Sequence, residues 1–356
     1  MGCRMGAMRV AGAVLAFAAA GSALAAELPR RWVARDLGTL GDYPVLARGI
    51  DDLGRVVGIS RRTDTVYVHG FATGPDGGAI ADLCPAAEWG CDAQGINSRG
   101  EVVGGYLSDD IGTWSAFAVQ ADTTSFRMLP TLGGAGYTLA HAVNDHGQVA
   151  GESRVAAPDG AVHAFASTPN GARLHDVGAH GFSAGDSAAM AINGDGMIAG
   201  VGVTPQGQWH AMSAPVPHGR LIDLGTFGGD SSAATAIAPD GRIVGWADLP
   251  EGNWRAFIVP AAGGPLQAFG TLGGSSSEAA SINMHGHVVG RATTPWDAEW
   301  HAVVIDAAVG KLIDLNKRTS ALPAGVTLVA AQAINRRDQI AASGSDGHAY
   351  LLMPVR

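Results

Sequence analysis

The amino-acid sequence predicts an all-β fold and, within that class, a seven-bladed β-propeller of four-stranded blades. The first reason is a unit with three landmarks that recurs seven times at a spacing of about 47 residues, which is the size of a propeller blade. The second is that no unit has a continuous helical hydrophobic pattern free of Gly and Pro, which excludes helical repeat arrays. A β-solenoid is the alternative architecture, but its turns are usually shorter than this period.

The first landmark is a turn sequence of the type Ile-Asn-x-x-Gly-x-Val-Val-Gly. An Asn followed three residues later by Gly is typical of a type I turn whose last position tolerates positive φ, so the β-branched segments on either side should form a hairpin. The residues at the Asn position are Asp51, Asn97, Asn144, Asn193, Ala238, Asn283 and Asn335.

Two further landmarks follow in each unit. A His-Ala-Phe tripeptide alternates its side chains between two faces, as a third strand would, and an Asp-Leu-Gly sequence, as at Asp223, ends a fourth strand. Since the histidines recur once per blade around a ring, we expect hydrogen bonds inside each blade and no convergence on one metal or catalytic site. The first residues of the tripeptides are His69, Ser115, His163, His210, Arg255, His301 and His348.

The two ends of the chain support closure into a ring. The last unit stops after its third strand, at residues 348–352, and the missing fourth-strand sequence stands at about residues 31–38. We therefore expect the N-terminal strand to pair with the last blade, which removes two exposed sheet edges. Residues 26–356 would then form a single domain.

Composition and charge exclude some classes of function. The chain has 52 glycines among 356 residues and 47% hydrophobic residues, so it is rich in turns and too apolar to be disordered. The net charge is -9 and no basic cluster occurs. Nucleic acid is therefore not expected as a partner, because phosphate binding needs clustered Lys and Arg.

The first 25 residues have the pattern of a cleaved signal peptide. Arg4 and Arg9 precede an apolar run over residues 10–20, and Ala23-Leu24-Ala25 offers a small-residue cleavage site. A membrane anchor is the weaker reading, because the run is shorter than the ~20 residues that span a bilayer. We expect an exported protein, periplasmic or extracellular, with no membrane insertion after cleavage.

Export would leave two cysteines, Cys84 and Cys91, in one short segment. In an oxidising compartment such a pair most simply forms a disulfide. Two free thiols or a metal site are the alternatives. A metal site is the weaker of these, because structural zinc usually takes four ligands.

The landmarks resemble the HAF repeats of bacterial extracellular proteins, named for their His-Ala-Phe tripeptide. This chain has His163-Ala164-Phe165, Ala191-Ile192-Asn193 and Val56-Val57-Gly58 in the corresponding places, and the likeness extends from about Asp36 to Tyr350. The resemblance implies a secreted or surface-associated repeat protein with no assigned catalytic residues. Departures at Asp51, Ala238, Ser115 and Arg255 suggest that the repeated polar side chains are replaceable and structural.

Single-copy features are the better candidates for a functional site. Residues 181–185 read Gly-Phe-Ser-Ala-Gly, but that nucleophile motif needs a strand-to-helix elbow, and no helix is expected after it. His175, Asp176, His180 and Asp186 could hold a metal, but they read more simply as a polar loop. No catalytic residue, metal ligand or cofactor is predicted.

Propellers commonly bind ligands on the face formed by the connections between blades and the loops between second and third strands. Exposed aromatic side chains beside carboxylates on that face suit stacking on a sugar or anchoring a protein. The candidates are Tyr43, Trp89, Tyr106, Asp109, Asp110, Tyr137, Asp230, Trp246, Glu278 and Trp296.

The sequence therefore predicts a monomeric, exported, non-enzymatic binding or scaffold module with a glycan or protein ligand. The alternative is a secreted propeller hydrolase or lyase that acts on polysaccharide. Such an enzyme would need carboxylates, or a His with a carboxylate, to converge at the central funnel, and the sequence shows no constellation of this kind that breaks the repeat. A purely structural surface protein is the third possibility.

Overall fold

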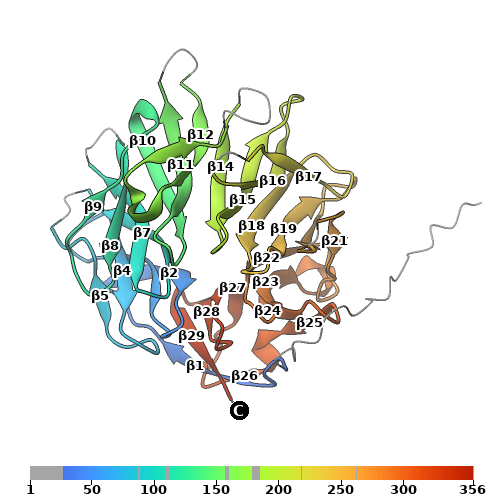
Figure 1. Cartoon of the computed structure of the whole chain (residues 1–356). Coiled ribbons are helices and arrows are strands. Elements are labelled where there is room, and N and C mark those ends of the chain that lie inside the picture. The colour runs from blue at the N-terminus through green and yellow to red at the C-terminus, as the bar shows by residue number, and fades with distance from the viewer. Residues whose placement is uncertain are drawn as a thin grey trace, which may run out of the picture.

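The computed structural model describes residues 27–86, 89–108, 112–156, 160–178, 185–217, 219–261 and 263–355. These residues form an all-β, propeller-like fold with three short 3-10 helices, η1 (Pro169–Gly171), η3 (Pro295–Asp297) and η4 (Leu315–Lys317). Figure 1 shows the sheets arranged around a common centre. The predicted signal peptide, residues 1–25, lies outside the described residues.

Four sheets have four antiparallel strands each and correspond to single repeat units. The first strand of each sheet lies against the first strands of its neighbours, on the inner side of the molecule. The four sheets are β2 (Asp42–Ile50), β3 (Val56–Arg61), β4 (Val68–Thr73) and β5 (Ile80–Asp82); β14 (Ser187–Ile192), β15 (Met197–Val203), β16 (Trp209–Pro215) and β17 (Ile222–Gly225); β18 (Ser232–Ile237), β19 (Ile243–Asp248), β20 (Trp254–Val259) and β21 (Gln267–Ala268); and β22 (Ser277–Ile282), β23 (His287–Thr293), β24 (Trp300–Asp306) and β25 (Lys311–Asp314).

The second and third repeat units share one eight-stranded sheet. Its joint is a single parallel pair between Tyr137 of β10 and Trp114 of β8. The joint forms because β10 has 11 residues, so its leading end extends into the connection and runs along the preceding unit. The strands are β6 (Cys91–Ile96), β7 (Glu101–Leu107), β8 (Trp114–Gln120), β9 (Arg127–Met128), β10 (Gly133–Val143), β11 (Val149–Val155), β12 (Val162–Ser167) and β13 (Leu174–Asp176).

The sixth sheet contains both ends of the described chain. Its order is β26 (Thr319–Ser320), β1 (Trp32–Asp36), β29 (Ala349–Pro354), β28 (Ile340–Gly344) and β27 (Leu328–Ile334). The leading strand β1 pairs antiparallel with β29 along its whole length, from Trp32 opposite Pro354 to Asp36 opposite Tyr350, which is the place predicted for it. The parallel pairing of β26 with β1 was not anticipated.

The count of separate blades differs from the sequence prediction. Five sheets of four or five strands stand alone as blades, and the eight-stranded sheet is continuous. The structure therefore shows five separate blades, not seven. The excess length of β10, which no repeat landmark announces, accounts for the difference.

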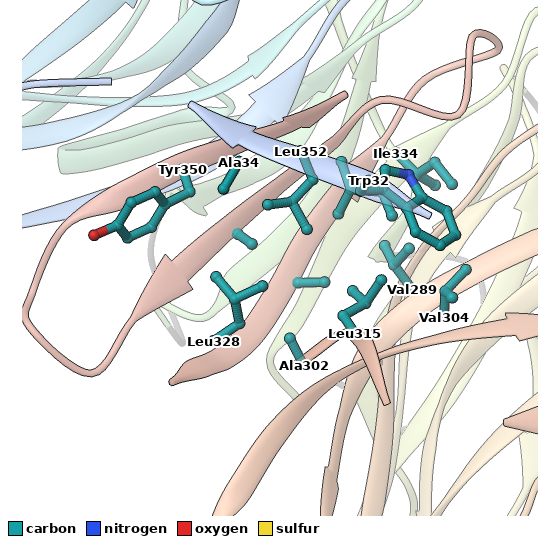
Figure 2. Close-up of a cluster of buried hydrophobic side chains, with 13 residues drawn as sticks. Trp32, Ala34, Val289, Ala302, Val304, Leu315, Leu328, Ile334, Tyr350 and Leu352 are labelled. Atoms are coloured by element: carbon teal, nitrogen blue, oxygen red, sulfur yellow. The ribbon is translucent and has the colours of Figure 1, made fainter. Parts of the chain in front are cut away.

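The seam around β1 is held by a hydrophobic cluster (Figure 2). Trp32 is fully buried, and its ring lies over Leu315 of η4 and over Val289 and Val304 of the preceding sheet. The indole Nε1 of Trp32 donates a hydrogen bond to the Asp338 carbonyl at 3.0 Å. One side chain thus joins the leading strand to two sheets, and full burial of an aromatic ring of this size stabilises the fold by about 2–3 kcal/mol.

The Val-Val-Gly glycine is required by a close approach between strands. A Cβ at Gly104 would lie 1.8 Å from the Asp92 carbonyl oxygen, and one at Gly245 would lie 1.9 Å from the Ala233 carbonyl oxygen. A one-residue register shift in the facing inner strand, as between Ala93 and Gly95, brings that carbonyl inward. The glycine therefore accompanies a bulge in six of the seven inner hairpins, while the last repeat has its bulge with Ala342 at this position.

The Asn landmark forms the predicted turn and also links repeats. In its own turn, Asn97 Oδ1 accepts from the Arg99 and Glu101 amides at 3.1 and 2.9 Å, and Gly100 has φ +80°. Its Nδ2 then donates to the carbonyl at the same position of the next repeat. These side-chain to carbonyl bonds are Asn97 to Asn144, Asn144 to Asn193, Asn193 to Ala238, Asn283 to Asn335, and Asn335 to Asp51.

No helix in the described part of the chain has the length and apolar character needed to cross a bilayer.

Candidate ligand-binding site in the central channel

The repeated histidines form structural pairs inside the sheets. His69, His163, His210 and His301 each contact, through Nδ1, the Asp that ends the fourth strand of the same repeat, at 2.9–3.1 Å. His348 makes the same contact at 2.8 Å with Asp36 of the leading strand. This confirms the expected hydrogen bonding between strands.

The predicted disulfide between Cys84 and Cys91 is present, with the two Cα atoms 6.5 Å apart. Within the described residues, one group of three side chains has the spacing of metal ligands: His69, Asp82 and Cys84. Because the Cys84 sulfur is bonded to Cys91, it offers no thiolate, and Asp82 is already engaged by His69 and by Arg62 at 3.2 Å. This cluster is therefore structural.

The turn end of the molecule has a central cavity of about 380 Å³. It is lined by the Ile position of all seven repeats, which is Val143 in the third, and by the Asn position of six of them, for example Asn97. The amide groups of the Asn residues are engaged in their own turns and in the links to the next repeat. Further polar side chains in the lining are Asp52, Ser98, Asp145 and Arg336.

The opposite end of the channel holds a cavity of about 340 Å³ with a different lining, called here the upper-channel cavity. Trp246 of β19, Glu278 of β22 and Arg291 of β23 lie on one side. Arg48 of β2 and Gln332 of β27 complete it from the first and last repeats. These positions carry other residue types in other repeats, so the repeat itself does not require them.

Two of these groups form a bidentate ion pair. Arg291 Nε and Nη2 lie 2.7 and 3.0 Å from the two carboxylate oxygens of Glu278. The Arg291 guanidinium also stacks 4.4 Å from the centre of the Trp300 ring. The two parallel N–H···O contacts and the stacking on Trp300 hold the Arg291 guanidinium in a defined orientation.

A row of tryptophans continues from this ion pair. The Trp300 and Trp254 rings are stacked with centroids 6.1 Å apart, and Trp254 lies 6.3 Å from Trp246. Trp254 and Trp300 start the third strands of consecutive repeats, so their stacking follows from the repeat. Within the described residues, the buried Trp254 Nε1 has no hydrogen-bond partner.

A second polar cluster lies on the side of the third repeat. Tyr137 donates its hydroxyl to Glu152 Oε1 at 2.5 Å, and His141 Nε2 lies 3.6 Å from the same oxygen. Tyr137 and Glu152 line a cavity of about 230 Å³ together with Trp209 and Asp186. The sequence analysis did not anticipate this cluster, in which a Tyr, a His and a carboxylate lie close together.

The electrostatics of this cluster set the protonation states of Tyr137 and Glu152. Burial and the hydrogen bond to Glu152 raise the pKa of the Tyr137 phenol. Burial also acts to raise the pKa of Glu152, but the contacts with His141 and Tyr137 outweigh it, and the net pKa is lowered. Glu152 is thus a carboxylate at neutral pH, and Tyr137 a neutral phenol.

Asp92 lies on the inner strand β6 between these two regions. Burial raises the pKa of Asp92, and the charges of Arg48 and His141 oppose this shift. Its Oδ2 accepts from Gln94 at 2.7 Å, and within the described residues its buried Oδ1 has no hydrogen-bond partner.

The predicted ligand residues separate into groups. Trp246 and Glu278 share the upper-channel cavity, and Tyr137 lies at the second cluster. Asp230 accepts from Gln208 at 3.0 Å, and Trp296 is 96% exposed.

Two other predicted residues pack on neighbouring rings. Trp89 lies edge-on to Tyr67, and Tyr106 lies edge-on to Phe126. The side chains of Tyr43, Asp109 and Asp110, and most of the motif at residues 181–185, lie outside the described part of the chain.

Sequence reasoning missed Arg48, Glu152 and Arg291. The signal that could have found them is variation at two fixed repeat positions. One is the residue that follows the Val-Val-Gly glycine, which is Glu152, Trp246 or Arg291 in three repeats. The other is the residue three before the Asn position, which is Arg48 in the first repeat.

Comparison with known proteins supports the fold. No family model and no curated protein matches the sequence. A puromycin hydrolase structure is similar with a TM-score of 0.56 and 15% identity, over 94% of this chain and 58% of that one. A structure of YCF48 bound to D1 peptide has a TM-score of 0.54 and 12% identity, over 92% and 98%. A prolyl endopeptidase structure has a TM-score of 0.57 and 13% identity, over 93% of this chain and 51% of that one.

At these identities the likeness shows an all-β, propeller-like repeat fold and nothing further. The chain spans about half the length of the hydrolases and peptidases that it matches.

Proposed function

We propose that this chain is an exported, non-enzymatic binding module whose ligand is a glycan. The observation that carries the proposal is the upper-channel cavity, where Trp246 faces the same space as the Glu278–Arg291 pair. An aromatic face beside planar charged groups suits a sugar, which has an apolar ring face and equatorial hydroxyls.

A protein ligand fits this cavity less well. Protein interfaces bury about 800 Å² on each partner and use flat patches with aromatic anchors. The upper-channel cavity is instead a concave space of about 340 Å³. Because the similar structure of YCF48 is bound to a peptide, the test below includes peptide binding as the competing result.

The proposal includes a complete seven-bladed ring, of the HAF-repeat type. Support comes from the β1–β29 pairing and from the link between Asn335 and the Asp51 carbonyl, which lies 284 residues away in sequence. The joint in the eight-stranded sheet is one residue pair, so its two halves would behave as two blades. The disulfide supports export, because such bonds persist in oxidising compartments.

The test is an immobilised oligosaccharide array, followed by titration calorimetry on the bound members. We expect Trp246→Ala to weaken binding at least tenfold, because the stacking surface is removed. Trp296→Ala is the matched control, since that side chain is exposed in η3 and does not line the upper-channel cavity, and it should bind as the wild type does. Equal affinity of the Trp246 variant, or capture of peptides with no oligosaccharide bound, would contradict the proposal.

A second candidate function, a glycan hydrolase or lyase, is favoured by the cluster of Tyr137, His141 and Glu152. It brings a His and a carboxylate to the channel, which such chemistry requires. Against it, the raised pKa of Tyr137 keeps this side chain a neutral phenol, so no phenolate is available as a base. Release of reducing ends or unsaturated products from a polysaccharide, abolished by Glu152→Gln, would establish the enzyme. Binding of a polysaccharide without turnover would instead support the non-enzymatic binding module.

A further inference from the structure

The charges in the upper-channel cavity do not cancel. Glu278 and Arg291 neutralise each other through their two short contacts. Arg48, which lines the same cavity, has no carboxylate within salt-bridge distance among the described residues. One positive charge is therefore left facing the channel of a chain whose net charge is -9.

The nearest carboxyl group on the neighbouring inner strand does not remove this charge. Asp92 Oδ2 accepts a hydrogen bond from Gln94 at 2.7 Å, and within the described residues Asp92 makes no salt bridge with Arg48. The two charges therefore interact only through space. An exposed arginine without a fixed partner presents its guanidinium fork for a planar or tetrahedral anion.

The positions of Arg48 and Trp246 define the ligand further. Arg48 belongs to the first repeat and Trp246 to the fifth, and both line one cavity. A ligand that stacks its ring on Trp246 can direct an acidic group towards Arg48 while the Glu278–Arg291 pair meets its hydroxyls. A neutral sugar would leave the Arg48 charge without a partner in a partly enclosed space, where charge pairing is stronger than in water.

We propose that the upper-channel cavity selects an acidic glycan, in which a carboxylate or a sulfate ester pairs with Arg48. This inference rests on the proposed function, and it goes further by naming the class of sugar. The pairing is non-covalent, so binding should weaken as salt is added. The Arg48 position is occupied by Gln94, His141, Met190, Thr235, Ala280 and Gln332 in the other repeats, so the arginine is not needed to build a blade.

The experiment uses the full exported chain on an array of matched oligosaccharides. One set carries uronic acids together with carboxyl-reduced counterparts, and the other carries sulfate esters together with desulfated counterparts. We expect acidic members of one set to bind at least tenfold more tightly than their neutral counterparts, and the set that binds tells carboxylate from sulfate. Arg48→Gln should remove most of this preference.

Two controls separate the outcomes. Arg173→Gln makes the same change of charge at an exposed site on the edge of β13, and it should retain the preference. Circular dichroism and thermal unfolding establish that each variant is folded. Equal binding of neutral and acidic members, or an Arg48 variant that keeps the preference, would overturn this inference and leave glycan binding intact. A folded wild type that binds no member would overturn both proposals.

Discussion

His348 and Asp36 are 312 residues apart in sequence, and their side chains meet at 2.8 Å across the seam of the last sheet. The contact repeats the His–Asp pairing that four other repeats make within a single run of chain. It differs only in that its Asp comes from the leading strand. The pair therefore marks the place where a repeat is completed by the beginning of the chain.

Asp36→Ala should loosen the seam. The pair is partly exposed, with 43% of the Asp36 side chain accessible, so we expect a loss of less than about 1 kcal/mol in the free energy of unfolding. The specific effect is faster amide exchange in β1, measured by hydrogen exchange and mass spectrometry.

Asp223→Ala is the matched control for this seam variant. Asp223 has the same exposure, pairs with His210 and accepts from the Gly225 amide, as Asp36 does from the Gly38 amide. It should cost a similar amount of stability without changing exchange in β1. Similar exchange in β1 for both variants would argue against a special role for the seam pair.

Gly104→Ala should destabilise the protein by about 2 kcal/mol or more, because the new Cβ would lie 1.8 Å from a backbone oxygen that cannot move freely. Gly194→Ala is the control, since a Cβ there meets no atom within 4 Å. Urea unfolding measures both. A Gly104 variant as stable as the Gly194 variant would show that the bulge is not tightly packed.

Removal of the disulfide by Cys84→Ser and Cys91→Ser should lower the free energy of unfolding by about 2 kcal/mol. The crosslink closes a short loop, and the loss of chain entropy that it imposes on the unfolded state is correspondingly modest. Thermal unfolding of the variant against the oxidised wild type provides the measurement. Unchanged stability would mean that local packing alone holds this loop.

Asp92→Asn should stabilise the protein at neutral pH. Because burial raises the folded-state pKa of Asp92 above its unfolded value, ionisation opposes folding, and stability is lost as pH rises through the folded pKa. The variant should therefore have a larger free energy of unfolding than the wild type at pH 7. This difference should disappear below the unfolded-state pKa of Asp92, near pH 4. Urea unfolding at pH 3 and pH 7 tests this. A gain that is equal at both values would assign the effect to packing.

The repeat landmarks predict most of the fold because each serves a local physical need. Asn97 holds its own turn, Gly104 permits a close strand approach, and four of the five paired histidines contact an Asp 13 residues away, as His69 does. The eight-stranded sheet could not be predicted in this way. It depends on the length of β10, whose leading part pairs with β8 of the preceding unit through Tyr137.

The candidate site was only half predictable. Trp246 and Glu278 were proposed as exposed polar and aromatic features of single repeats. Arg48 lies 198 residues before Trp246 in sequence and meets the same cavity only because the sheets are arranged around one centre. The Tyr137–Glu152 contact could not be predicted for a similar reason, since it joins the unusually long β10 to β11.

The upper-channel cavity takes residues from both the first and the last repeats. Its shape therefore depends on the leading strand being bound to the last sheet. Hydrogen exchange of the wild type at the amides of Trp32 and Leu37, which donate to the Arg318 and Ala349 carbonyls, addresses this directly. Protection as strong as that of β28 is the expected result. Exchange at the rate of an unstructured peptide would contradict it.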